Sequence, residues 1–353
     1  MLPVNQLPYV GLERLGWSVT LVAPAAWSHE YRREPFDCRP HADLAGTYRP
    51  LPVALRGRPQ RHFYTRSTRN ELRRWRPEVL VIEEESFSAA ALQWGVAARR
   101  ERIPFAVQAA ENLDRPLPAL VRQSRSWVLA NAALVVARSP RAAELARRWG
   151  AAGDVRVVPH HVPGWPEVDV RRGEAFRIGF AGRLVPEKGL DVLVEAVKLL
   201  DGGVELVVAG DGPQREWLEA QRFGGRLTLL RGLSHDDMGS AYARMDVLVL
   251  PSRSTPNWSE QFGRVLVEAL STGVPVLGSD SGEIPWVIDV TGGGFVFPEG
   301  DSRRLAGLLS RLRDDEGLRR ELGERGKDRV RVQFSVPAVA ATMHAALLPV
   351  CTN

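Results

Sequence analysis

The sequence predicts an α/β protein built from two doubly wound domains, each with helices on both faces of a mostly parallel sheet. Short apolar runs alternate with segments of helical periodicity along both halves of the chain, which is typical of this class. A proline- and glycine-rich segment at 159–174 separates the two halves. The 353 residues are enough to bury two separate hydrophobic cores.

The first half carries apolar runs typical of buried strands, alternating with helical patterns. The expected strands are Val19–Val22, Val79–Ile82, Phe105–Val107, Leu134–Val136 and Val155–Val158. The expected helices are His62–Trp75, Phe87–Arg99 and Arg141–Trp149. Such a domain normally opens with a strand and a glycine-rich loop, whereas this chain is expected to start inside the first helix, at about Asn5–Leu15. Two explanations are open: the recorded start is too late, or the domain lacks one edge of its ligand cleft.

The segment Pro159–Glu174 predicts an interdomain linker, because it is rich in proline and glycine and lacks periodicity. We therefore place an N-terminal domain at residues 1–165 and a C-terminal domain at residues 166–335. The last helical pattern, Val336–Leu348, is expected to pack back on the first domain. The pair His160–His161 suggests a metal site, but adjacent side chains rarely converge on one ion and no third ligand follows at a familiar spacing. A role at a hinge or in lining a cleft is favoured, and no metal site is expected.

The second half repeats the strand–helix alternation more clearly. The expected strands are Phe176–Ala181, Val204–Ala209, Leu227–Leu230, Asp246–Leu250, Val274–Leu277 and Gly294–Phe297. The expected helices are Glu187–Leu200, one from Gln214, one after Asp237, one opening near Phe262 or Gly263, Ser302–Arg313 and Gly317–Lys327.

Composition favours a cytoplasmic protein. The two cysteines, Cys38 and Cys351, cannot make a disulfide framework and lack metal-ligand spacing. No uncharged apolar run reaches the length of a membrane span, and the N-terminus lacks the apolar core of a signal peptide. The formal charge is +5.

Arginine is concentrated between Arg49 and Arg76, where Glu71 is the only acid. One interpretation is a set of solvated helix and loop side chains. The other is a patch for anionic lipid headgroups or an anionic acceptor, which would allow peripheral contact with the inner face of the membrane. Nucleic acid is not an expected partner, because no recognition motif accompanies the charge.

The turn after the strand Phe176–Ala181 has the features of a phosphate-binding loop. Gly182 lets the backbone approach a ligand, Arg183 leaves the strand end, and Lys188 is expected in the first turn of the next helix. The alternative interpretation is an ordinary strand-to-helix turn with a surface arginine and lysine. Neither a Walker A motif nor the full G-x-G-x-x-G fingerprint is present, which disfavours ATP or NAD.

Two acids flank the helix that opens near Phe262 or Gly263. Glu260 precedes this helix and Glu268 lies on its second turn. A helix start attracts phosphate, whereas carboxylates repel it. The two acids are therefore expected to accept hydrogen bonds from hydroxyls on either side of a diphosphate, which indicates a nucleotide-sugar site.

Four segments, taken together, resemble one family: GRLVPEKG, AGDGP, EQFGRVLVEAL and GVPVLGSDSGEIPWVI. In this order they are similar to the nucleotide-binding half of the GT-B glycosyltransferases of family GT4. The resemblance is specific over Phe176–Asp301 and weak over the first 160 residues. It implies two Rossmann-like domains that face each other across a cleft, with a nucleoside diphosphate sugar held mainly by the second domain.

The resemblance also implies roles for individual residues. Arg183 and Lys188 would contact the diphosphate, beside the backbone at Gly182. Glu268 would bind the ribose hydroxyls and Glu260 those of the donor sugar. The turn at Gly232–Leu233 would contact the base. Backbone N–H groups near the helix start would reach the sugar and phosphate, and these belong to Phe262, Gly263, Val265 and Leu266.

Family members of this type transfer a sugar with retention at its anomeric carbon and generally without a metal, and the sequence has no Asp-x-Asp motif. The implied donor is a UDP- or GDP-sugar, and the implied acceptor is a glycan, a lipid-linked sugar or a natural product. No cofactor is implied. Many relatives place a histidine after the strand near Phe105–Val107, where this chain has Glu111 and Asn112. These two residues take that role, or they form a plain strand-end turn.

Two other functions are open. The chain could be a non-catalytic nucleotide-sugar-binding subunit that supports a partner transferase, or a GT-B-fold epimerase acting on a nucleotide sugar. The seven-residue spacing between Glu260 and Glu268 favours transfer over epimerisation.

Overall fold

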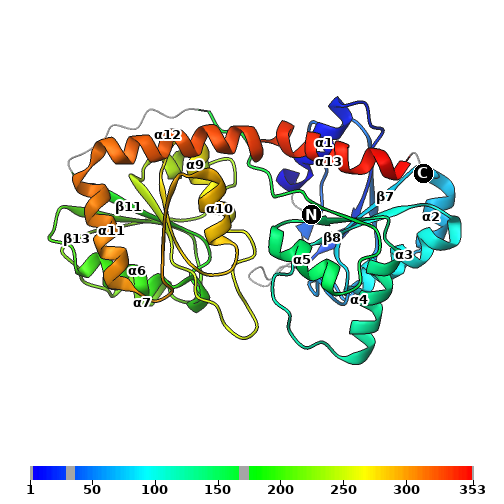
Figure 1. Ribbon diagram of the computed structural model, residues 1–353, viewed down its shortest axis with the longest axis horizontal. Helices are drawn as coiled ribbons and strands as arrows, with labels where there is room; N and C mark the ends of the chain where they lie inside the picture. The colour runs from blue at the N-terminus through cyan, green and yellow to red at the C-terminus, as the bar shows by residue number, and fades with distance from the viewer. Residues whose placement is uncertain (1–2, 29–35, 167–174, 352–353) are drawn as a thin grey trace. The chain divides into compact units, whose positions relative to one another are not determined.

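The computed structural model describes residues 3–28, 36–166 and 175–351 of the chain (Figure 1). The chain divides into two compact units. Unit 1 contains Met1–His161 and Val336–Asn353, and unit 2 contains Val162–Ser335. The boundary between the units falls between His161 and Val162. The sequence predicted it four residues later, between residues 165 and 166. Residues 167–174 of the expected linker lie outside the described part.

The strands of unit 1 are β1 (Thr20–Pro24), β2 (Ala26–Trp27), β3 (Phe36–Asp37), β4 (Thr47–Leu51), β5 (Val53–Ala54), β6 (Phe63–Tyr64), β7 (Leu80–Glu85), β8 (Phe105–Ala109), β9 (Leu134–Ala137) and β10 (Asp154–Val157). Its helices are the 3-10 helix η1 (Pro3–Gln6) and the α-helices α1 (Leu7–Arg14), α2 (Thr68–Trp75), α3 (Ala89–Glu101), α4 (Ala119–Asn131), α5 (Pro140–Arg148) and α13 (Val336–Cys351).

The main sheet of unit 1 is parallel and has the strand order β10-β9-β8-β7. Alternate residues of its central strands enter two different cores, as expected for a sheet covered on both faces. On one face, Ala106, Leu134 and Val136 pack against α1 and α13, which lie side by side (Figure 1). On the other face, Val107 and Val135 pack against α2 to α5.

Three features of unit 1 differ from the sequence prediction. The helix expected at His62–Trp75 begins only at Thr68, where the Ser67 side chain accepts a hydrogen bond from the N–H of Asn70 and so caps it. Before that cap, β6 pairs with β5 in a short antiparallel ladder. The expected strand at Val19–Val22 forms β1, but it pairs with β4 rather than with the four-stranded sheet. Helix α4 was not predicted at all.

The strands of unit 2 are β11 (Phe176–Ala181), β12 (Val204–Ala209), β13 (Gly225–Leu230), β14 (Val247–Leu250), β15 (Val276–Ser279) and β16 (Gly294–Phe297). Its helices are the 3-10 helix η2 (Pro186–Lys188) and the α-helices α6 (Leu190–Lys198), α7 (Arg215–Glu219), α8 (Met238–Ala243), α9 (Arg264–Ser271), α10 (Ile284–Thr291), α11 (Ser302–Asp314) and α12 (Glu316–Gln333).

The sheet of unit 2 is parallel and has the order β13-β12-β11-β14-β15-β16. The chain builds outward from β11 in one direction, then returns to the centre and builds outward from β14 in the other. This is the doubly wound order that the strand–helix alternation predicts. In such sheets the ligand site lies at the carboxyl ends of the two central strands, where the direction of winding changes.

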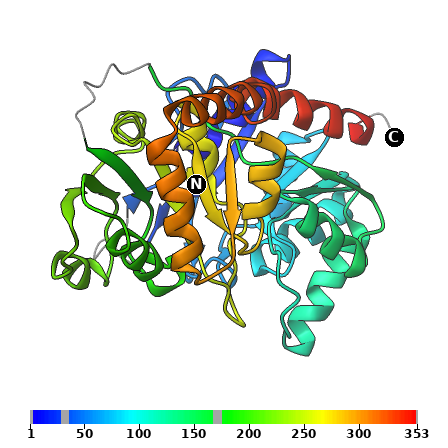
Figure 2. The same ribbon diagram turned by 60° about the vertical axis from the view of Figure 1, so that its left-hand side comes forward.

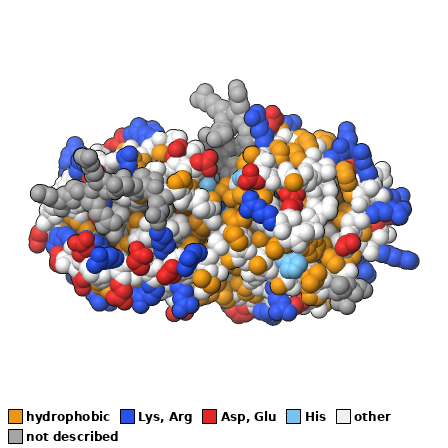
Figure 3. All heavy atoms as spheres, turned by 90° about the horizontal axis from the view of Figure 1, so that it is seen from above, with side chains coloured by type: hydrophobic (Ala, Val, Ile, Leu, Met, Phe, Trp, Pro, Cys, Tyr) orange, Lys and Arg blue, Asp and Glu red, His pale blue; other side chains and the backbone are white. Residues whose placement is uncertain are grey.

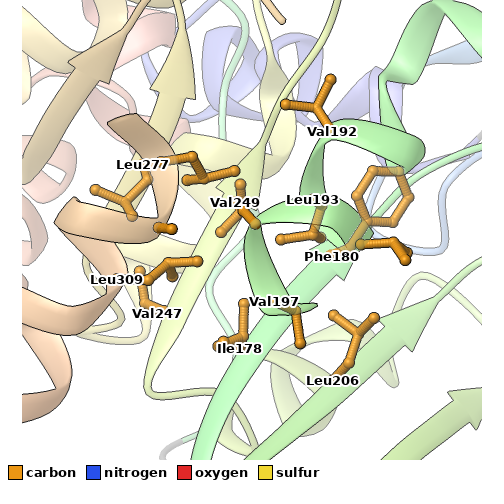
Figure 4. Close-up of a cluster of buried hydrophobic side chains, with 14 of the residues drawn as sticks. Ile178, Phe180, Val192, Leu193, Val197, Leu206, Val247, Val249, Leu277 and Leu309 are labelled. Carbon is orange, nitrogen blue, oxygen red and sulfur yellow. The ribbon is translucent and has the colours of Figure 1, made fainter. Parts of the chain in front are cut away.

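Strand residues of unit 2 alternate between two cores. Ile178, Val247 and Val249 enter a core with helix α6 and helix α11, which cover one face of the sheet (Figures 2 and 4). Leu248 and Leu250 enter the second core, with α8, α9 and α10 on the other face. The four inner strands, β11, β12, β14 and β15, are buried on both faces and are therefore nearly continuous apolar runs, which is why the sequence located them well.

Loops at the carboxyl edge of this sheet are held together by glycines at which a side chain would not fit. Gly189 has a φ of +64°, and a Cβ built on it would lie 1.9 Å from the carbonyl oxygen of Pro251. A Cβ on Gly210 would lie 1.9 Å from the carbonyl oxygen of Gly182. The positive φ at Gly189 also ends η2, so the helix expected at Glu187–Leu200 begins at Leu190 instead.

The substitution Gly189→Ala is expected to destabilise unit 2 by about 3 kcal/mol, because it combines a left-handed backbone cost of about 1 kcal/mol with overpacking. The matched control is Gly203→Ala, since Gly203 has a φ of +65° but nothing within 4 Å of its added Cβ. The control should lose only about 1 kcal/mol. Urea unfolding of the two variants measures the difference, and equal losses would contradict the close-contact explanation.

Candidate functional site

The candidate site lies at the carboxyl ends of β11 and β14, the two central strands of unit 2. Lys188 follows β11, and Glu260 follows β14. Their side chains form an ion pair, with 2.6 Å between Lys188 Nζ and Glu260 Oε2. The Ser252 hydroxyl donates to the same carboxylate oxygen at 2.7 Å, and the Trp258 ring centroid lies 5.2 Å from the ammonium. The structure thus brings together two residues that the sequence assigned to the same site.

Both members of this pair are largely removed from water, since the side chains of Lys188 and Glu260 are 14% and 10% exposed. An unpaired charge at that depth is costly, so each ion depends on the other. The backbone of Glu260 is also fixed, because its carbonyl accepts a hydrogen bond from the N–H of Glu283 at 2.9 Å. A Cβ on Gly282 would lie 2.0 Å from that carbonyl oxygen.

Helix α9 begins beside Glu260. Its N-cap is Gly263, with a φ of +72°. Phe262 and Leu266 are buried core side chains, and Phe262 contacts the rings of Trp286 and Phe334. The side chains of these two residues anchor the helix start in the core, which leaves only their main-chain groups available for the predicted contacts, while Val265 is half-buried. The N–H of Leu266 donates to the carbonyl of Gly263 at 2.8 Å, which uses one of the donors that the sequence assigned to the ligand.

Glu268 is 4% exposed, and its Oε2 atom accepts a hydrogen bond from the hydroxyl of Tyr242 at 2.6 Å. Burial, together with the charge of Glu268, raises the pKa of Tyr242 well above its usual range. The phenol therefore stays protonated and donates to the carboxylate. Tyr242 is not among the residues that the sequence predicts for the site. The available signal was a tyrosine within the apolar pattern of a helix, since a buried phenol needs a hydrogen-bond partner.

The remaining predicted residues of unit 2 lie on loops at the same sheet edge. Gly182 and Arg183 directly follow β11, and Arg183 is exposed. Leu233 lies in the loop after β13, is 36% exposed and follows Gly232, whose φ is +63°. Lys188 ends the 3-10 helix η2 rather than standing in the first turn of an α-helix. Lys188 directly precedes Gly189, the N-cap of α6, so its charge still lies beside the start of that helix.

In unit 1 the predicted residues Glu111 and Asn112 follow β8 and are buried, at 6% and 5% exposure. Glu111 accepts hydrogen bonds from Arg115 at 2.7 Å and from the N–H of Leu113 at 3.3 Å. Beside it, Glu85 at the end of β7 accepts from the N–H of Ala110 at 2.8 Å. Burial raises the pKa of Glu85 to about 7, and the charges of Glu111 and Glu84 add to the rise.

The arginines between Arg49 and Arg76 are not all equivalent. Arg69 and Arg73 both pair with Glu101, and Arg49 lies 3.6 Å from Glu71. Arg58 and Arg61 are exposed and line a hollow of about 300 Å³. On the face of the molecule seen in Figure 3, acidic and basic side chains are interspersed.

In residues 3–28, 36–166 and 175–351 no group of three or more histidine, cysteine or acidic side chains is arranged to hold a metal ion. Across those same ranges, none of the helices combines the length and the apolar character needed to cross a bilayer.

Two family models match the chain. Residues 165–329 match the model described as glycosyl transferases group 1, and residues 9–161 match the model described as glycosyl transferase 4-like domain. Among solved structures, sucrose-phosphate synthase from Thermosynechococcus elongatus has a TM-score of 0.73 at 19% identity, covering 99% of this chain and 92% of that one. The fold is therefore of the GT-B class.

Curated relatives agree. The 2-deoxystreptamine glucosyltransferase of Streptomyces kanamyceticus is 30% identical over 69% of this chain and 70% of that protein. A GDP-mannose-dependent phosphatidylinositol monomannoside mannosyltransferase of Mycobacterium tuberculosis is 30% identical over 49% of this chain and 47% of that protein. The chain belongs to family GT4, the glycosyl transferases group 1. Three further curated glycosyltransferases are matched over only 41%, 42% and 28% of their lengths.

The raised pKa of Glu85 predicts a pH-dependent stability. Between its ordinary value of 4.5 and about 7, the native state binds a proton that the unfolded state releases. Stability should therefore fall as pH rises through that interval. The variant Glu85→Gln removes this loss and keeps an oxygen for the N–H of Ala110, so at pH 8 it should be more stable than the native chain by up to about 3 kcal/mol.

Thermal unfolding at pH 5 and pH 8 measures this effect. The matched control is Glu144→Gln in the same unit, because Glu144 is exposed and its ion pair with Arg141 lies on the surface. A Glu85→Gln variant with the same pH dependence as the native chain would contradict the assignment.

Proposed function

We propose that this protein is a retaining glycosyltransferase that moves a sugar from a UDP- or GDP-sugar to a hydroxyl group of an acceptor. The ion pair between Lys188 and Glu260 carries the proposal, because it places a cation and a carboxylate beside the start of α9. A cation and a helix start suit a diphosphate, and a carboxylate suits the hydroxyls of the sugar attached to it.

In this proposal Lys188 binds both the carboxylate of Glu260 and the diphosphate. An ammonium group has three N–H donors, so it can keep its bond to Glu260 while it also donates to a phosphate oxygen. Glu260 then presents its second oxygen to a hydroxyl of the donor sugar. Arg183 lies on the loop just after β11 and adds positive charge near the phosphates. Glu268 binds the ribose hydroxyls, and the loop at Leu233 contacts the base.

The reaction breaks the bond between the anomeric carbon and the diphosphate oxygen, and a bond to the acceptor oxygen forms on the same face of the sugar. Negative charge grows on the leaving diphosphate, where Arg183, Lys188 and the start of α9 stabilise it. The acceptor's proton passes to the departing phosphate, so no protein side chain is assigned as general base. Metal-independent transfer is part of the proposal, supported by the lack of an Asp-x-Asp motif.

The names of the relatives favour this donor class. One relative is a glucosyltransferase named for 2-deoxystreptamine and another is named as GDP-mannose-dependent. For this chain the acceptor class stays broad: a sugar, a lipid-linked sugar or a small molecule. Glu111 and Asn112, which follow β8, are proposed to contact the acceptor.

The substitutions Glu260→Ala and Lys188→Ala should each lower turnover by roughly a hundredfold, because each removes a charge worth about 3 kcal/mol in the transition state. The measurement is release of nucleoside diphosphate from a panel of UDP-, GDP- and ADP-sugars. Lys198→Ala is the matched control, since Lys198 pairs with Glu195 at 2.8 Å on the surface of α6 and should keep full turnover.

Full turnover in both site variants would overturn the mechanism. The same assay separates the alternatives. Donor binding without turnover under any acceptor identifies a non-catalytic subunit. A changed sugar in the recovered donor, after incubation without acceptor, identifies an epimerase.

We also propose a cytoplasmic protein that contacts the inner face of the membrane through the arginines of the Arg49–Arg76 segment. The sequence alone selects Arg58, Arg61, Arg69 and Arg73 for this contact. Because Arg69 and Arg73 pair with Glu101, the contact is assigned first to Arg58 and Arg61.

Replacing Arg58 and Arg61 by Gln should weaken binding to phosphatidylglycerol vesicles at low salt by roughly thirtyfold, since each basic residue near an anionic surface contributes about 1 kcal/mol. Replacing Arg69 and Arg73 by Gln is the control and should keep most of the binding. Vesicle co-sedimentation measures both. Unchanged binding in the first variant would remove the membrane proposal and leave the transfer reaction untouched.

A further inference from the structure

We propose that Tyr242 is a positioning residue that makes the donor site select ribonucleotides, by holding the carboxylate of Glu268 toward the ribose hydroxyls. This inference rests on the proposed function, because it takes Glu268 as the ribose ligand. It adds a residue that the sequence pattern did not single out and assigns it a part in substrate selection.

The contact between the two side chains is close and dry. Tyr242 is fully buried on α8, Glu268 is 4% exposed on α9, and the phenol donates to Glu268 Oε2 at 2.6 Å. A buried carboxylate must be hydrogen-bonded or neutralised. The phenol of Tyr242 supplies that hydrogen bond without placing a positive charge beside the carboxylate.

The carboxylate is held asymmetrically. Tyr242 occupies Oε2, whereas no described side chain donates to Glu268 Oε1. A carboxylate with one oxygen fixed cannot rotate freely, so its other oxygen keeps a constant direction. Such an oxygen can accept hydrogen bonds from the adjacent 2′ and 3′ hydroxyls of a ribose. With the phenol removed, the carboxylate gains rotational freedom that binding must then remove.

Tyr242 is itself held in place. The ring of Trp165 packs against it with 5.9 Å between centroids, and the indole N–H of Trp165 donates to the carbonyl of His235 at 3.2 Å. Gly239 makes room for this indole, since a Cβ there would lie 2.6 Å from the Cβ of Trp165. The Arg264 guanidinium is the charged group on α9 that acts on the phenol besides Glu268. The packing around Tyr242 therefore fixes the position of its hydroxyl, and with it the orientation of the Glu268 carboxylate.

The test compares Tyr242→Phe with the native chain in calorimetric titrations of UDP, GDP and their 2′,3′-dideoxy counterparts. The native chain is expected to bind the ribo form of its preferred nucleotide at least tenfold more tightly than the dideoxy form. Tyr242→Phe should weaken ribo binding about tenfold and leave dideoxy binding unchanged. In the double variant Tyr242→Phe/Glu268→Gln, the tyrosine change should add nothing to the loss caused by Glu268→Gln alone.

The matched control is Tyr48→Phe in unit 1, which removes a phenol hydrogen bond to the carbonyl of Cys38 at 2.6 Å and should leave both nucleotides unaffected. An equal loss of ribo and dideoxy binding in Tyr242→Phe would show a merely structural role and overturn the inference. A selective loss in Glu268→Gln with none in Tyr242→Phe would also overturn it, while the proposed function stands. No binding of any nucleotide to the native chain would overturn the proposed function itself.

Discussion

The ion pair between Lys188 and Glu260 joins the loop after β11 to the loop after β14, which are 72 residues apart in the chain. Parallel strands all end at one edge of a sheet, so the doubly wound order brings these two loops together although the sequence separates them. Because Lys188 and Glu260 are largely shielded from water, leaving either charge unpaired would cost a large free energy. The hydroxyl of Ser252, the ring of Trp258 and the start of α9 are arranged around this one contact, and the chemistry proposed for the site depends on it.

The sequence predicted unit 2 well because its strands are buried on both faces and separated by turns with clear signals. It predicted that Lys188 and Glu260 serve one site, but it could not show that they touch, since contact depends on side-chain direction. It placed Lys188 inside an α-helix because helical periodicity continues across Gly189, and only the left-handed backbone at that glycine separates η2 from α6. The sequence did not indicate Tyr242, because a tyrosine in an apolar helical pattern is normally interpreted as a core residue. Its partner Glu268 also lies 26 residues away in the sequence.

Unit 1 was harder to predict for physical reasons. Strands β2, β3, β5 and β6 have two residues each, too few for an alternating pattern to appear. Helix α4 buries Val128 and Leu129, but it also exposes Leu120 and buries Arg125 against the ring of Trp149, so its apolar side chains mark its buried face only in part. The sequence predicted a possible ligand position at the end of β8, but it gave no sign of the neighbouring Glu85. Its raised pKa depends on burial and on the charge of Glu111, which are properties of the folded chain.

The glycines at the sheet edge of unit 2 also bear on how the site could change. At Gly189 and Gly210 an added side chain would meet main-chain oxygen at 1.9 Å, so the loops that carry the cationic end of the site are closed to variation. Gly232 is different, since an added Cβ there meets nothing within 4 Å, and the adjoining Leu233 reaches solvent. Under the proposed function, single substitutions at that loop can change the nucleobase preference, while the contacts to the diphosphate stay the same.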